Sequence, residues 1–134
     1  MIDKINNKTV TLEKALDAAW LRNEVISNNI ANVNTPGFKK SYVRFEEYFT
    51  DAQEKFKISG NKKDPKFLPI GKDSVISVNP EIAQESFTSM RRDDNNVDID
   101  VEMAELAKNT IKYNALIAQM SKEFSKIKLA INGR

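Results

Sequence analysis

The chain has 134 residues, a net charge of +2, and neither cysteine nor histidine. These absences exclude disulfides and thiolate chemistry and remove the commonest general base and transition-metal ligand. The 21 basic and 19 acidic residues are interspersed, so no segment forms the cationic surface that nucleic acids bind. We therefore expect no enzyme, no cofactor or metal site and no nucleic-acid partner.

The first predicted helix begins at Thr9 or Thr11, where a hydroxyl can cap free backbone N–H groups, and it continues to about Val33. Its seam positions alternate by four and three, as in a coiled coil, and one of them is the polar Asn23. A buried asparagine there would fix the register of two helices; the alternative is a half-buried, solvated side chain. Trp20 is expected to anchor the rim of this seam or a subunit contact. The seam consists of Leu12, Leu16, Ala19, Asn23, Ile26, Ile30 and Val33.

A tight turn is predicted directly after this helix. The helix must end before Pro36, because proline disfavours helical geometry at the preceding residue. Asn32 or Asn34 can adopt the left-handed conformation that commonly ends helices. Pro36 and Gly37 then fit the two central positions of a type II turn, and Phe38 is placed to pack on the helix end.

Helical periodicity fades in residues 41–94. Four aromatic residues near the start of this stretch fit a short helical turn, and Ser74–Val78 gives a modest strand signal that Pro80 ends. We interpret residues 41–94 as a largely irregular, partner-ordered segment with room for a short β-hairpin. The aromatic residues are Phe45, Tyr48, Phe49 and Phe56.

The second predicted helix follows candidate caps at Asn95, Asn96 and Asp98 and ends before Gly133. Nine of its ten seam positions are apolar, and they span about 34 residues, or about 50 Å. A stripe of small residues beside the seam would let another helix approach closely. The small residues are Ala104, Ala107, Ala115 and Ala118. The seam consists of Ile99, Met103, Leu106, Thr110, Tyr113, Ile117, Met120, Phe124, Ile127 and Ile131.

These elements predict a mainly α fold in which two long N- and C-terminal helices pair as an antiparallel coiled-coil hairpin. The chain divides into an N-terminal helix and turn (1–40), the middle segment (41–94) and a C-terminal heptad helix (95–134). The first helix is expected to span about 33 Å, so about 17 Å of the longer seam would lack a partner within the chain. Helices of other copies are the simplest cover, and contacts that do not close on themselves build filaments.

The acidic run before the second helix partly matches a calcium-binding loop. Asp94, Asn96 and Asp98 stand at loop positions one, three and five, and Glu105 stands at position twelve. Ile99 occupies the position where glycine makes the sharp turn of such a loop. Helix capping and favourable charge near the helix N-terminus therefore explain these acids better than calcium does.

The sequence contains no apolar stretch near the roughly 18 residues of a membrane span. Residues 1–10 lack the apolar core of a cleavable signal peptide. If the protein leaves the cytoplasm, we expect it to use another export route.

Two segments resemble a known family. Residues 27–39, SNNIANVNTPGFK, are similar to the N-terminal signature of bacterial flagellar rod and hook proteins, and residues 95–116 resemble the proximal rod members of that family. The resemblance implies a structural subunit of the flagellar basal-body rod, a hollow drive shaft that transmits torque and conducts exported subunits. It also implies export by the flagellar type III system and a position on the periplasmic side of the inner-membrane ring.

The partners that the resemblance implies are other copies of the chain, other rod proteins, the FliE adaptor and the export gate. An alternative interpretation of the seams is a coiled-coil adaptor or secretion chaperone that does not polymerise. The residues expected at subunit interfaces are Leu12, Leu16, Trp20, Asn23, Ile26, Ile30, Asn32, Asn34, Pro36, Gly37, Phe38, Met103, Leu106, Thr110, Tyr113, Ile117, Met120, Phe124, Ile127 and Ile131.

Overall fold

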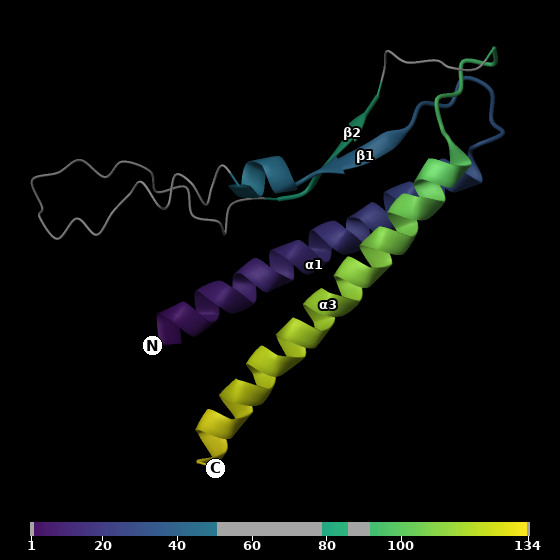
Figure 1. The fold of residues 1–134 in the computed structure, drawn as a ribbon. Helices are drawn as coiled ribbons and strands as arrows, with labels where there is room; N and C mark the ends of the chain where they lie inside the picture. The colour runs from purple at the N-terminus through teal and green to yellow at the C-terminus, as the bar shows by residue number, and fades with distance from the viewer. Residues whose placement is uncertain (1, 51–78, 86–91, 134) are drawn as a thin grey trace, which may run out of the picture.

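The computed structural model describes residues 2–50, 79–85 and 92–133, and two long helices dominate it (Figure 1). Helix α1 (Ile2–Ala31) ends beside the start of helix α3 (Ile99–Asn132), so the two helices run antiparallel. Strands β1 (Ser41–Arg44) and β2 (Glu81–Gln84) form a small sheet next to α1. The predicted mainly α architecture, with long terminal helices packed together, is confirmed.

Helix α1 begins at Ile2, so the predicted start at Thr9 or Thr11 is wrong. Neither glycine nor proline occurs in Ile2–Ala31, so no helix breaker interrupts this stretch. The helices therefore have 30 and 34 residues, a difference in length of only about 6 Å. The expected 17 Å mismatch is wrong, and exposure of apolar residues on α3 needs another explanation.

The turn after α1 has the predicted geometry. Gly37 has a φ of 72°, and the Phe38 N–H donates to the Thr35 carbonyl at 3.3 Å, as in a type II turn. The expectation for Asn32 and Asn34 is wrong, because Asp94 is the only non-glycine residue with positive φ in the described ranges. The last turn instead tightens into hydrogen bonds that span three residues, from the Asn32 N–H to the Asn29 carbonyl and from the Val33 N–H to the Ile30 carbonyl.

The two strands pair antiparallel, with Val43 opposite Ile82. They lie on the side of α1 that presents Ala18 and Val25, and Phe45 completes this small core. Residues 46–50 are helical, and the Phe45 and Phe49 rings stack with centroids 5.3 Å apart. The middle segment thus contains a short hairpin, as the sequence allowed. The predictions for Phe56 and for residues 74–78 lie outside the described residues.

Helix α3 is capped at both ends as predicted. The Asp98 side chain accepts hydrogen bonds from the backbone N–H groups of Asp100 and Val101. Gly133 adopts the left-handed conformation, and its N–H donates to the Leu129 carbonyl. These caps satisfy backbone groups that lack partners inside the helix.

Only half of the residues on the face of α3 that packs on α1 belong to the expected seam. The other half are different residues, which alternate with them along the helix. Two of the buried residues, Glu102 and Asn109, hydrogen-bond to α1 and so fix the orientation of the helix. The heptad positions shared with the predicted seam are Leu106, Tyr113, Met120 and Ile127. The side chains that alternate with them on the packed face are Glu102, Asn109, Leu116 and Glu123.

Candidate assembly interface

A cluster of hydrogen bonds ties the closed end of the helical pair together. The Asn29 side chain is fully buried, and its Nδ2 donates to the Ser41 carbonyl at 2.8 Å and to Glu102 Oε2 at 3.0 Å. Its Oδ1 accepts from the Ser41 N–H at 3.0 Å. One amide of α1 therefore holds both the start of β1 and the first turns of α3.

Asn95 caps the C-terminal end of α1 from across the chain. Its buried Nδ2 donates to the carbonyls of Asn32, Val33 and Thr35 at 2.9–3.0 Å. Its Oδ1 accepts from the Val97 N–H at 2.8 Å. The carbonyls at a helix end have no partner within the helix, so the buried Asn95 amide supplies the donors that these carbonyls lack.

Glu102 is 1% exposed, and its charge is balanced by Lys40, whose Nζ lies 2.6 Å from Oε1. A buried carboxylate without such a cation would be strongly destabilising. The two stretches that resemble the family motifs therefore meet in space through Asn29, Asn95 and Glu102, which we call the polar clasp. These contacts are not among those expected from the sequence. The sign of them was the polar Glu102, which recurs with Asn109 at a seven-residue interval on α3.

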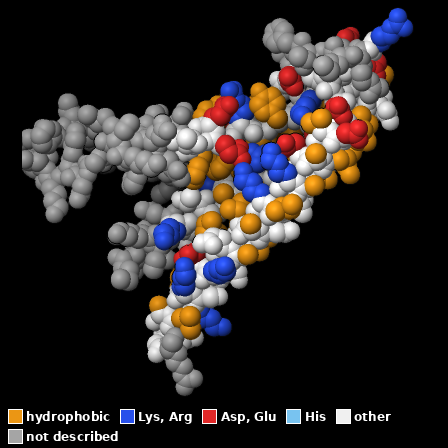
Figure 2. Space-filling view, viewed as in Figure 1, with side chains coloured by type: hydrophobic (Ala, Val, Ile, Leu, Met, Phe, Trp, Pro, Cys, Tyr) orange, Lys and Arg blue, Asp and Glu red, His pale blue; other side chains and the backbone are white. Residues whose placement is uncertain are grey.

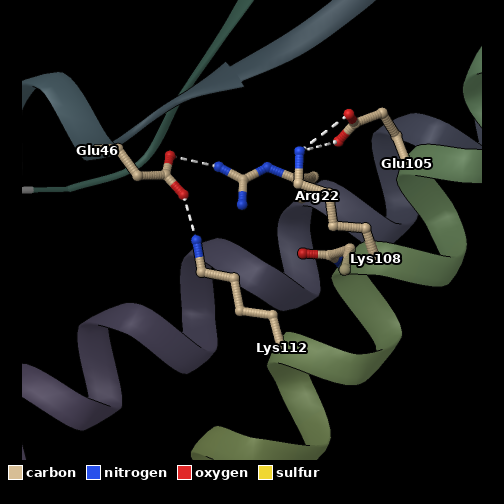
Figure 3. Close-up of a pocket in the computed structure, with 6 residues that line it drawn as sticks. Arg22, Glu46, Glu105, Lys108 and Lys112 are labelled. Carbon is tan, nitrogen blue, oxygen red and sulfur yellow. Dashed lines mark hydrogen bonds and ion pairs between the residues drawn. The ribbon is translucent and has the colours of Figure 1, made fainter.

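Glu46 joins both helices to the segment after β1 (Figure 3). Its carboxylate lies 2.5 Å from Arg22 of α1 and 2.6 Å from Lys112 of α3. Burial raises the pKa of Glu46, but hydrogen bonds and charge attraction from Lys112 and Arg22 outweigh it and lower the pKa to about 2. The recess around these groups contains no group of three or more acidic side chains able to hold a metal, within the described residues.

One flank of α3 exposes large apolar side chains. Five residues at seven-residue intervals form this apolar flank, and its four apolar members are between 44% and 78% exposed. Hydrophobic side chains follow the length of α3 in the space-filling view (Figure 2). Trp20 of α1 is 61% exposed. The apolar flank consists of Met103, Thr110, Ile117, Phe124 and Ile131.

The helical residues expected at subunit interfaces fall into two groups. Those buried or half-buried within the single chain are Leu12, Leu16, Asn23, Ile26, Ile30, Leu106, Tyr113, Met120 and Ile127. Those exposed are Trp20 and the apolar flank. Asn23 is half-buried, and its Oδ1 accepts from Asn109 Nδ2 at 2.9 Å, so this asparagine is partnered across the helices.

The residues of the predicted turn lie together at the closed end of the helical pair. Asn34, Pro36 and Gly37 are exposed there, whereas Asn32 and Phe38 are half-buried. The Gly37 N–H donates to the Asp93 carbonyl at 2.7 Å, which ties the turn to the residues before α3. The turn is therefore held in one arrangement at the closed end of the helical pair.

Two long helices, fixed to each other at one end and exposing an apolar flank, are the arrangement expected of a structural protein. No helix in the described ranges is long and apolar enough to cross a membrane. Residues 11–39 match the family described as "Flagella basal body rod protein".

Relatives match over most of the chain. The chain is 37% identical over 122 residues to the flagellar basal body rod protein FlgB of Bacillus subtilis, covering 91% of each chain. It is 34% identical to FlgB of Borreliella burgdorferi and 35% identical to FlgB of Borrelia hermsii, covering 87% of this chain and 89% of each relative. The chain therefore belongs to the FlgB family of flagellar basal body rod proteins. It is a structural component of the basal body and not an enzyme.

Proposed function

We propose that this chain polymerises through its terminal helices into the proximal part of the flagellar rod. The observation that supports this proposal is the apolar flank of α3, which is exposed in a chain of the FlgB family. Burying a large apolar side chain contributes about 1.5–3 kcal/mol, so covering four half-exposed ones is worth several kcal/mol. That free energy becomes available only when another helix covers the flank.

The internal contacts leave this flank free for assembly. The polar members of the packed face, Glu102, Asn109 and Glu123, are each hydrogen-bonded or ion-paired within the chain. The apolar side chains of the flank, which runs beside the packed face, are left in solvent. Each of these polar side chains thus has a partner within the chain, whereas the apolar flank has none.

In this proposal the assembled subunits form a hollow shaft that transmits motor torque and conducts exported subunits. The shaft lies on the periplasmic side of the inner-membrane ring, and the flagellar type III system exports its subunits. Further partners are the other rod proteins, the FliE adaptor and the export gate. The membership of the chain in the rod protein family supports these assignments.

The test places a charge on the apolar flank. Ile117→Asp and Phe124→Asp should each abolish rod assembly and motility, because burying an unpaired carboxylate costs several kcal/mol. Ile82→Asp is the matched control, since Ile82 is 57% exposed on β2 and lies outside the helical pair. Cryo-microscopy of basal bodies and swimming in soft agar measure the two outcomes.

Motile cells with normal rods in both flank variants would refute the proposal. A defined one-to-one complex with a single partner, without higher assemblies, would instead indicate an adaptor or secretion chaperone. Sedimentation of the complexes separates these results.

A further inference from the structure

Helix α1 presents a ridge of exposed side chains on its outer surface. The ridge members recur at intervals of four, three and four residues, which places them in one row along the helix. Within the part of the chain that the structure describes, its three carboxylates form no ion pair. We call this row the acidic ridge, and it consists of Glu13, Asp17, Trp20 and Glu24.

The C-terminal two-thirds of α3 has the opposite charge. Between residues 110 and 133 the one acidic side chain, Glu123, is buried and paired with Lys126. The exposed charges there are all lysines, namely Lys112, Lys122, Lys126 and Lys128. Lys128 lies four residues after Phe124 and three before Ile131, so it is a neighbour of both apolar side chains on the helix surface.

We propose that the acidic ridge of one copy packs on the apolar flank of α3 of a second copy, with Trp20 against Phe124 and Glu24 beside Lys128. This inference rests on the proposed polymerisation and names the surfaces that meet. Trp20 and Glu24 are four residues apart, as are Phe124 and Lys128, so two parallel helices bring both pairs together. Tryptophan is enriched among the residues that dominate the binding energy of protein interfaces.

This contact cannot form within one chain. Asn23 hydrogen-bonds to Asn109, which fixes Glu24 beside that level of α3. Lys128 is nineteen residues further along the helix, or about 28 Å away. Two α3 helices placed together would oppose lysines to lysines, whereas the acidic ridge supplies charges of the opposite sign.

The absence of cysteine allows a direct test by disulfide formation in assembled rods. A Glu24→Cys/Lys128→Cys chain should give a ladder of cross-linked copies on oxidation, because disulfides need Cα atoms within about 7 Å. We expect about tenfold more cross-linked product than from Glu81→Cys/Lys128→Cys, whose first position lies on β2. Rods that assemble without this excess would overturn the inference and leave polymerisation itself standing.

Charge reversal gives a second readout that does not depend on oxidation. Lys128→Glu should reduce rod assembly and motility, and adding Glu24→Lys in the same chain should restore them because the pair is re-formed with opposite polarity. Adding Glu81→Lys instead should give no rescue. Normal assembly of Lys128→Glu, or failure of Glu24→Lys to rescue it, would overturn the inference. Loss of assembly in Ile117→Asp, whose position lies outside the two proposed residue pairs, tests polymerisation separately.

Discussion

Replacing Asn95 by alanine tests whether the polar clasp holds the closed end of the helical pair. The change removes the donor to three backbone carbonyls and the acceptor for the Val97 N–H. A buried polar group left without a partner costs about 1–3 kcal/mol, so the total loss should be about 4 kcal/mol. For a chain of this size, that lowers the thermal midpoint by about 12 °C.

Thermal unfolding of the full chain, followed by far-ultraviolet circular dichroism, measures this loss. Asn34→Ala is the control, because Asn34 is exposed in the same turn and its loss should cost less than about 0.5 kcal/mol. Asn95→Asp keeps the shape but removes the donor and brings charge beside the carbonyls. Equal midpoints for Asn95→Ala and Asn34→Ala, or a fully stable Asn95→Asp, would refute the reasoning.

Two further predictions concern the other polar contacts between the elements. Glu46→Gln should lower the unfolding free energy by about 1 kcal/mol after solvent screening of its two ion pairs. Because the pKa of Glu46 is lowered in the folded chain, this difference should be constant above about pH 5 and vanish as the pH falls towards 2, as urea titrations across pH would show. Asn23→Leu/Asn109→Leu should raise the free energy of unfolding by about 1–2 kcal/mol, and the urea midpoint with it, because Asn109 Oδ1 is buried and accepts no hydrogen bond in the described ranges. An unchanged or lowered midpoint would show that this acceptor is satisfied.

Features governed by neighbouring residues could be predicted from the sequence. The Asp98 cap, the Gly133 cap and the turn at Pro36 and Gly37 each depend on a few adjacent backbone groups. The start of α1 was missed because threonines at Thr9 and Thr11 resemble caps but are also tolerated inside a helix. A residue that could cap a helix does not mark its start when no glycine or proline precedes that residue.

The packed face of α3 could not be predicted from periodicity. Two possible packing faces of α3 share Leu106, Tyr113, Met120 and Ile127. Periodicity favours the face whose other members are more apolar. The chain instead buries Glu102 and Asn109, because Asn29, Lys40 and α1 backbone groups satisfy them. Those partners are some 60–90 residues away in sequence, so spacing alone gives no sign of them.

The pairing of β1 with β2 brings together the two ends of the chain that runs between these strands. Arg44 lies opposite Glu81, so the polypeptide leaves and re-enters the folded part at adjacent points. Closing a longer excursion between two joined points costs only about 0.6 kcal/mol for each doubling of its length. An affinity tag inserted after Thr50, beyond the contacts of Phe45, Glu46 and Phe49, should therefore leave the pairing of α1 with α3 unchanged.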